Sequence, residues 1–273
     1  MNRKNIRLIA LDMDGTLLNS KKKVDPQTIT AINEAVMKGI TVVYCSGRGI
    51  VELDEYQDAL SAMRYGVCLS GALVYDFKEE RPIYENNIDK AYIPAIIRVA
   101  EEFDAMCHIL LTHESIVEHS CISHMEDYHM GIYTEMFRRV ARQVENMETE
   151  AKNHPSIPKI NIYFRSIEDK NAGFERLKDL PLSFASPEIT SVEMNANHVS
   201  KATGLRNLAD HLHISMDEVM AIGDGDNDRQ VLKSAGLSVA MANAGEKIKS
   251  LCDVITDDND HDGVGKAIRK YCF

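Results

Sequence analysis

The N-terminal part of the chain alternates between apolar runs and segments with helical periodicity. Residues 6–11 (IRLIAL) form a short, nearly continuous apolar run that ends at Asp12, as is typical of a strand buried on both faces of a parallel sheet. A helix is predicted over residues 26–38, because Asp25 is a suitable N-cap, a proline follows it, and Gly39 suits the end. The chain therefore begins with a strand and a helix.

This order of elements continues and then recurs near the C-terminus. Residues 41–45 (TVVYC) predict a second strand, a helix-like stretch reaches to about Met63, and residues 67–69 predict a third strand. Ser200 is a suitable cap for a helix through Leu212. Further strands are predicted at residues 219–223, 237–241 and 253–255. Such repeats are typical of right-handed parallel crossovers, so the predicted fold is α/β with a Rossmann-like parallel sheet.

The segment between these two α/β parts has a different character. Acids, histidines, methionines and tyrosines are more frequent there and periodicity is weaker, although residues 159–165 (KINIYFR) alternate between polar and apolar positions. We interpret residues 85–192 as an inserted α+β domain, and residues 1–84 and 193–273 as the two parts of a core domain.

Composition narrows the classes of partner. The 273 residues include 31 Lys and Arg against 42 Asp and Glu, a formal charge of −11 that repels nucleic acid and anionic membranes. A small anionic ligand remains compatible, because a bound cation or a lysine reverses the field inside one pocket. The six cysteines form no CxxC pair, and the first apolar run is too short for a signal peptide, so a cytoplasmic protein is expected. The sequence predicts no particular oligomeric state.

Two acids follow the first predicted strand. Asp12 and Asp14 are separated by one residue and followed by Gly15, which permits a tight turn and puts both carboxylates beside one small space. Carboxylates this close are costly unless a cation neutralises them, and hard oxygen ligands favour magnesium. The alternative is an ordinary Asp-Gly turn.

A second acidic loop follows the predicted strand at residues 219–223. Asp224 and Asp228 are suited to complete a magnesium site, while glycines in the loop allow close approach of the backbone. The spacing excludes an EF-hand, because Ala235 occupies the twelfth position, where that calcium loop needs a glutamate. A solvated acidic loop is the alternative.

Two further pieces fall at predicted helix starts. Ser46 and Gly47 follow the second strand, where a hydroxyl and backbone N–H groups suit a phosphate, although a simple helix cap is the alternative. Lys201 begins the helix capped by Ser200, where the helix dipole disfavours an ammonium and a nearby anion is therefore indicated. Exposed lysines at helix starts are also common.

In this order, and all at predicted strand ends, the four pieces closely resemble the haloacid dehalogenase superfamily over the whole chain. The resemblance implies that Asp12 is the nucleophile and Asp14 the general acid and base of a magnesium-dependent enzyme. It implies that the phosphoryl group is held by Ser46, Gly47, Lys201 and Asn227. It implies that magnesium is bound by Asp12, the backbone carbonyl of Asp14, Asp224 and Asp228.

The branch of the superfamily is indicated by where the insertion falls. Only nine residues separate the glycine of the first motif from the cap of the following helix, so the first loop has no room for a cap domain. The insertion after the third strand resembles the type C2 cap of the Cof-type (IIB) branch, as do Ser70 and residues 263–268. Many relatives carry Asn in place of Ser70, Gly in place of Ala202 and Pro in place of Asn197; none of these differences removes a catalytic group.

The resemblance implies hydrolysis of small phosphomonoesters through a phosphorylated Asp12. Phosphatases and phosphomutases of the superfamily keep the second acid, here Asp14, whereas dehalogenase and phosphonatase branches lack it. Sugar phosphates, nucleotides and phosphorylated cofactors are the expected substrates. The alternatives are a sugar phosphomutase and a non-catalytic regulator that binds magnesium and a phosphorylated ligand.

The inserted segment offers two further hypotheses. Because polar and apolar residues alternate over 159–165, one side of the predicted strand carries Lys159, Asn161, Tyr163 and Arg165. These side chains are either substrate-specificity residues or an ordinary solvent-exposed face. Five histidines between His108 and His129, with Cys121 three residues before His124, raise the hypothesis of a second metal site, although no tight ligand pair is present.

Overall fold

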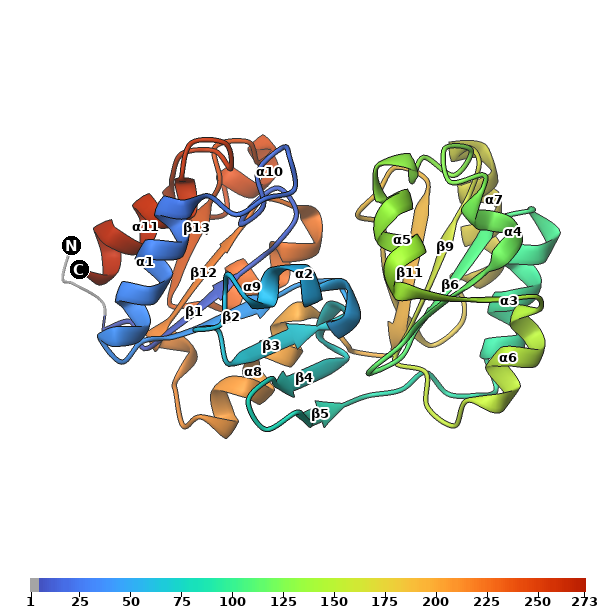
Figure 1. Ribbon diagram of the computed structural model, residues 1–273, viewed down its shortest axis with the longest axis horizontal. Coiled ribbons are helices and arrows are strands. Elements are labelled where there is room, and N and C mark those ends of the chain that lie inside the picture. Colours follow the sequence, from blue (N-terminus) through green and yellow to red (C-terminus); the bar gives the residue numbers. More distant parts are fainter. Residues whose placement is uncertain (1–4) are drawn as a thin grey trace. The chain divides into compact units, whose positions relative to one another are not determined.

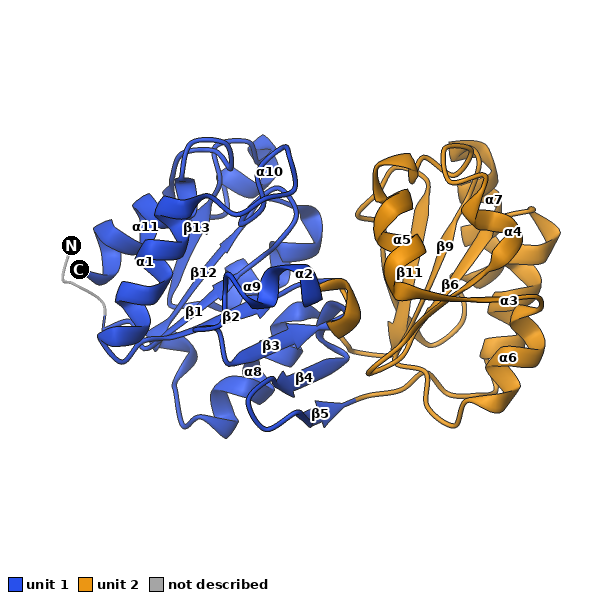
Figure 2. Ribbon diagram, in the orientation of Figure 1, with its two compact units in different colours: residues 1–47, 54–85, 200–273 blue, residues 48–53, 86–199 orange. Residues whose placement is uncertain are grey.

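Two β-sheets organise the chain, each at the centre of one compact unit (Figure 2). The computed structural model describes residues 5–273. Within these residues, the first unit comprises residues 5–47, 54–85 and 200–273, and the second comprises residues 48–53 and 86–199.

The sheet of the first unit has the strand order β14-β13-β12-β1-β2-β3-β4-β5 (Figure 1). From β14 to β3 all neighbours are parallel, and β4 and β5 extend this sheet as antiparallel strands. Every residue of β1 is buried, as its continuous apolar sequence predicts for a central strand. The strands are β1 Leu8–Leu11, β2 Thr41–Cys45, β3 Tyr65–Cys68, β4 Leu73–Asp76, β5 Arg81–Glu85, β12 Val219–Gly223, β13 Leu237–Ala240 and β14 Val254–Ile255.

Helices of the first unit pack around this sheet. Residues of α8 and α9 join the apolar core that includes Leu8 and Val43, while α1 packs against α11 and contacts β2. Asp25 caps α1 by accepting a hydrogen bond from the Gln27 N–H, and Ser200 caps α8 in the same way. The helices are α1 Pro26–Met37, α2 Asp54–Gln57, α8 Lys201–His211, α9 Arg229–Ser234, α10 Glu246–Lys249 and α11 Gly263–Cys272.

The predicted parallel α/β core is confirmed, with two local differences. The helix-like stretch to Met63 is wrong as a continuous helix, because it contains only the short 3-10 turn η1 (Ile50–Glu52) and α2. The sequence analysis also missed β4 and β5. Pro82 lies in β5, and a proline is tolerated there because β5 is the edge strand of its sheet.

The second unit is built on a separate sheet with the order β10-β11-β9-β6-β7-β8. Helices α3, α6 and α7 contribute to an apolar core with Ile109, Ile160 and Ile162, whereas α4 and α5 contribute to a smaller cluster with Met106 and Tyr163. Its strands are β6 Met106–Leu110, β7 Ser115–Glu118, β8 Ala141–Val144, β9 Lys159–Tyr163, β10 Leu182–Ala185 and β11 Ser191–Ala196. Its helices are α3 Ile93–Glu102, α4 His119–Ile122, α5 Thr134–Val140, α6 Met147–Asn153 and α7 Ile167–Leu177.

The end of the inserted unit lies further along the chain than the sequence indicated. The expected boundary between residues 192 and 193 falls inside β11, which pairs with β9 and β10 of the second sheet. The second unit therefore continues to Val199. It also includes residues 48–53, which the sequence analysis assigned to the core domain. No helix within residues 5–273 is long and apolar enough to span a bilayer.

Candidate active site

The site lies where neighbouring parallel strands of the first unit end. Asp12 follows β1, and its N–H donates to the carbonyl of Ile222 in β12 over 3.1 Å, so the loop that begins at Asp224 lies alongside. Gly15 has φ +81°, and a Cβ there would lie 2.4 Å from Asp224 Oδ2. A side chain at residue 15 would thus push against an acid of the site, which explains why a glycine follows the first two acids.

Lys201 links the C-terminal half of the unit to Asp12. Its ammonium lies 2.5 Å from Asp12 Oδ1 and 2.7 Å from Asp228 Oδ1, and all three side chains are buried. The residue before α8 lies very close to η2 (Leu69–Gly71). A Cβ on Gly71 would lie only 2.0 Å from the Ser200 carbonyl oxygen, so the glycine permits this approach. The position of Lys201 at a helix start indicated a nearby anion. The structure shows two, the carboxylates of Asp12 and Asp228, which come from different loops.

The second acidic loop is held by hydrogen bonds between side chains and backbone and by a hydrogen bond from Thr16. Asp228 Oδ2 accepts from the N–H groups of Asp224 and Gly225, both over 3.1 Å, while the Thr16 hydroxyl donates to Asp224 Oδ1 over 2.8 Å. The side-chain amide of Asn243 donates to the Gly15 carbonyl over 2.8 Å. The sequence analysis gave no role to Thr16 or Asn243, although Asn243 follows β13 and could have been found by the same strand-end rule.

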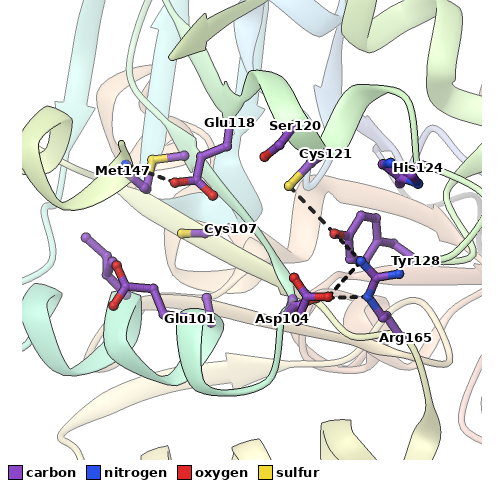
Figure 3. Close-up of a pocket in the computed structure, with 13 residues that line it drawn as sticks. Glu101, Asp104, Cys107, Glu118, Ser120, Cys121, His124, Tyr128, Met147 and Arg165 are labelled. Atoms are coloured by element: carbon purple, nitrogen blue, oxygen red, sulfur yellow. Dashed lines mark hydrogen bonds and ion pairs between the residues drawn. The ribbon is translucent and has the colours of Figure 1, made fainter. Parts of the chain in front are cut away.

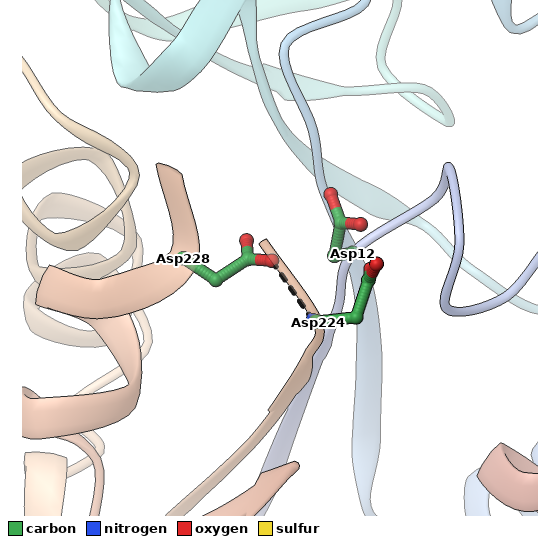
Figure 4. Close-up of side chains that lie close together, drawn as sticks. All are labelled: Asp12, Asp224 and Asp228. Atoms are coloured by element: carbon green, nitrogen blue, oxygen red, sulfur yellow. Dashed lines mark hydrogen bonds between the residues drawn. The ribbon is translucent and has the colours of Figure 1, made fainter. Parts of the chain in front are cut away.

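The three acids form a group able to hold a cation. One carboxylate oxygen from each of Asp12, Asp224 and Asp228 lies within 4.8 Å of the others (Figure 4). Three carboxylates against the single ammonium of Lys201 leave a formal charge of −2, which a divalent cation would neutralise. The donor set contains only oxygen, the chemistry that magnesium prefers. The residues present therefore fit a magnesium ion.

The protonation of these groups reflects the excess negative charge. Burial, and then the neighbouring Asp228, raise the pKa of Asp12 well above its usual range against the opposing effect of Lys201. Burial likewise raises the pKa of Asp224 to about 6. For Lys201, burial favours the neutral amine, but Asp12 and Asp228 outweigh it and hold the pKa of the ammonium well above its ordinary value.

Asp14 does not belong to this carboxylate group. Its side chain is partly exposed and makes an ion pair with Lys22, whose Nζ lies 2.7 Å from Asp14 Oδ1. A second carboxylate is therefore available two residues after the buried Asp12, in a more accessible position. This separation suits one acid to a covalent role and the other to proton transfer.

Two residues expected to hold a phosphoryl group, Ser46 and Asn227, follow β2 and β12 of the same unit, and the specificity candidate Ser70 follows β3. Ser46 is buried directly after β2, and its backbone links two loops, since its N–H donates to the Val67 carbonyl and its carbonyl accepts from the Ser70 N–H. Ser70 lies in η2 with φ +58°. Asn227 lies in the turn η5 (Asp226–Asp228), between two members of the carboxylate group.

Polar residues of β9 lie on a buried face of the second sheet, not on a solvent face. Lys159 makes an ion pair with Glu193 over 2.8 Å, and both side chains are almost fully buried. The Asn161 amide donates to the Tyr163 hydroxyl over 3.0 Å, and Asn161 pairs across the sheet with His108. This arrangement excludes the solvent-face interpretation for residues 159–163.

Arg165 is separated from those residues. It lies beyond the end of β9, and its guanidinium makes ion pairs with Asp104 and Asp127, each over 2.9 Å. It borders a cavity of about 450 Å³ within the second unit (Figure 3), whose lining also includes Cys107, Cys121, His124 and Tyr128. The alternation therefore does not extend to Arg165.

The histidines between His108 and His129 do not form a metal group with their neighbours. Within the described residues 5–273, the group of His, Cys, Asp or Glu side chains close enough to share an ion is the carboxylate group of the first unit. His108 is buried, its Nε2 lies 2.6 Å from the Ser115 hydroxyl, and burial lowers the pKa of its imidazole to about 3. The ring is therefore neutral.

Comparison with known proteins agrees with this geometry. Residues 9–268 match the family of haloacid dehalogenase-like hydrolases. A 5-amino-6-(5-phospho-D-ribitylamino)uracil phosphatase of Bacillus subtilis is 30% identical over 272 residues, which cover 98% of this chain and 96% of that protein. A chloroplastic endoribonuclease of Arabidopsis thaliana is 31% identical over 97% of this chain, but the chain spans only 46% of the length of that relative.

Solved structures extend the agreement to the fold. A subclass IIB sugar phosphatase of the same superfamily superimposes with a TM-score of 0.83 at 22% identity, over 97% of this chain and 99% of that one. The resemblance on which the sequence analysis relied is thus confirmed. The chain belongs to the haloacid dehalogenase-like hydrolases.

Proposed function

We propose that the protein is a magnesium-dependent phosphatase that hydrolyses small phosphomonoesters through a phosphorylated Asp12. The observation that carries this proposal is the charge arrangement of the first unit. The buried carboxylate of Asp12 makes an ion pair with Lys201 within a group of net negative charge. A more accessible carboxylate, that of Asp14, lies two residues away. A regulator that only binds a phosphorylated ligand has no need for this second acid.

In the first step, a carboxylate oxygen of Asp12 attacks the phosphorus, and the bond from phosphorus to the ester oxygen breaks. Asp14 gives its proton to the departing alkoxide, which leaves as the alcohol. Lys201 offsets negative charge beside the attacking carboxylate, and Ser46, Gly47 and Asn227 hold the phosphoryl oxygens. A magnesium ion bound by Asp12, Asp224, Asp228 and the backbone carbonyl of Asp14 would supply charge neutralisation for the phosphoryl group.

In the second step, Asp14 acts as a carboxylate and removes a proton from water. The water oxygen attacks the phosphorus, the acyl phosphate bond breaks, and inorganic phosphate is released with Asp12 restored as a carboxylate. Asp14 recovers in this step the proton that it gave up in the first. The same side chain must therefore face both the leaving oxygen and the incoming water.

We assign substrate preference in part to the second unit, through the buried polar side chains Lys159 and Asn161, and to Ser70 of the first unit. Named relatives act on the phosphates of a ribitylamino uracil and of a sugar. Small phosphorylated metabolites with hydroxyl-bearing organic parts are the substrates proposed here. The six free cysteines of the chain fit a reducing compartment such as the cytoplasm.

A phosphate-release assay over a panel of sugar phosphates, nucleotides and phosphorylated cofactors, with and without Mg²⁺, tests the proposal. Hydrolysis that requires Mg²⁺ and is lost in Asp12→Asn supports it. Isomerisation of hexose phosphates without release of phosphate would instead identify a phosphomutase. Tight binding of these esters with no turnover would identify a regulator.

A further inference from the structure

Three consecutive lysines, Lys21, Lys22 and Lys23, lie in the loop after the first two acids, and they differ in environment. Lys21 and Lys23 are exposed. Lys22 is partly buried, and its ammonium lies 2.7 Å from Oδ1 of Asp14. This distance is that of a short, charge-assisted hydrogen bond, so the middle lysine contacts the acid to which the proposed function gives both proton transfers.

The backbone of the loop holds Lys22 in this position. Lys22 adopts a left-handed conformation with φ +56°, which is costly for a residue with a Cβ and persists only where neighbouring contacts enforce it. Its N–H donates to the Asn19 carbonyl over 2.9 Å, and its own carbonyl accepts from the Tyr56 hydroxyl over 3.2 Å.

The residues on either side of Lys22 are held as well. The side-chain oxygen of Asn19 accepts from the N–H groups of Lys21 and Lys23, over 3.0 and 3.1 Å. The Asn19 N–H in turn donates to the Lys23 carbonyl over 2.9 Å. The turn is thus closed by several hydrogen bonds around Lys22, and its shape does not depend on the ion pair with Asp14 alone.

We propose that Lys22 is a positioning residue for Asp14. The side chain of Asp14 is about one-third exposed, and without a fixed partner a carboxylate at such a site rotates among several conformations. A hydrogen bond from Lys22 to one carboxylate oxygen limits both side-chain torsions of Asp14. It keeps the carboxylate in one orientation for both proton transfers. This inference rests on the proposed function, because it concerns the acid and base of that reaction.

The first test compares Lys22→Met, which keeps the aliphatic stem, with Lys22→Arg and the matched control Lys23→Met. With p-nitrophenyl phosphate and Mg²⁺, we expect Lys22→Met to lower kcat by about tenfold with KM changed less than about twofold, because proton transfer loses part of its advantage while binding is kept. Lys22→Arg should restore kcat to within about threefold, since a guanidinium offers the same bond. Lys23→Met should match wild type.

A double-mutant cycle tests whether Lys22 acts through Asp14. In an Asp14→Asn background, Lys22→Met should cause no further loss of kcat, because the group that it positions is already gone. Thermal unfolding of each variant controls for damage to the fold. If Lys22→Met is unfolded, the comparison of Lys22→Arg and Lys22→Gln at the same position replaces it.

Three results would overturn the inference: equal kinetics for Lys22→Met and Lys23→Met, additive losses in the Asp14→Asn background, or an effect of Lys22→Met on KM alone. The last would mean that Lys22 contacts the substrate instead. These outcomes are separate from failure of the proposed function, which would appear as absence of phosphate release from the wild-type protein.

Discussion

Both units bury a lysine among acids, but the balance of charge differs. In the first unit Lys201 lies between Asp12 and Asp228, with Asp224 close by, and the group keeps a formal charge of −2. In the second unit the buried side chains of Lys159 and Glu193, which carry opposite unit charges, form an ion pair on a sheet face. Burial of a charged side chain therefore does not by itself identify a reactive site. The uncompensated charge of the first group is what distinguishes it, because it favours a cation and strengthens the case for chemistry there.

The largest effect is expected from Asp12→Asn, which removes the nucleophile from the unbalanced group. The neutral amide is a poor nucleophile and a weaker metal ligand, so kcat for p-nitrophenyl phosphate should fall at least about 10⁴-fold. Phosphate release and trapping of the phosphorylated protein are the measurements. Full activity in this variant would mean that the covalent intermediate forms elsewhere.

Asp14→Asn should separate the two steps, with a fall of about 10²–10⁴-fold in steady-state turnover. Nitrophenolate is a stable anion that leaves without a proton, so this variant should release about one equivalent of it in a burst and then stall as the phosphorylated protein. With an alkyl phosphate, whose alkoxide needs the proton, no burst is expected. Rapid-mixing measurements with both esters make the comparison, and equal bursts would remove Asp14 from the role of acid.

Matched changes at the two buried lysines sharpen the contrast between the units. Lys201→Met should raise KM and lower kcat by about 10²-fold, because the phosphoryl group loses a neighbouring cation. Lys159→Met leaves Glu193 buried without its ammonium and should lower the free energy of unfolding by about 3–5 kcal/mol. Adding Glu193→Gln should recover much of that loss. If Lys159→Met instead impairs hydrolysis of p-nitrophenyl phosphate as strongly as Lys201→Met, the two groups do not differ as described.

A smaller effect is expected from Asn161→Leu on the buried polar face of the second sheet. The loss of one neutral hydrogen-bonding group should lower kcat/KM for a sugar phosphate by about 3–10-fold. Hydrolysis of p-nitrophenyl phosphate should change less, because the leaving group of this ester carries few polar groups on which a specificity residue could act. Exposed His124→Gln, in the same unit, serves as the control. An equal loss for every ester would indicate damage to the fold and no role in preference.

A further effect, on stability and not on hydrolysis, concerns pH and the neutral His108. Because its folded pKa, about 3, lies below its unfolded value, the imidazole contributes stability that is present above about pH 6.5 and lost as the pH falls toward 3. The loss should approach about 1.4 kcal/mol for each pH unit below 6.5, seen in denaturant unfolding between pH 6.5 and 5. His108→Gln should reduce this slope, whereas His124→Gln should leave it unchanged.

Much of the fold could be predicted because buried parallel strands leave continuous apolar runs. Strands β2 and β12 begin and end where the sequence indicated, and Asp25 and Ser200 cap their helices as expected. The stretch before Met63 failed because helical periodicity alone does not show that a segment breaks into short turns. The boundary near Val192 failed because β11 is paired in the second sheet, and such pairing partners are remote in sequence.

The candidate site could be predicted as a set of residues but not as an arrangement. The sequence by itself determined that acids, a serine and an asparagine follow strands that end at one edge of a sheet, because parallel strands share their direction, and that a lysine begins a capped helix. Only the tertiary structure decided which atoms meet. Lys201 reaches both Asp12 and Asp228, Arg165 turns to Asp104 and Asp127, and Lys22 makes an ion pair with Asp14. The physical reason is that side-chain direction depends on backbone torsions and on packing between distant segments, as the left-handed conformation of Lys22 illustrates.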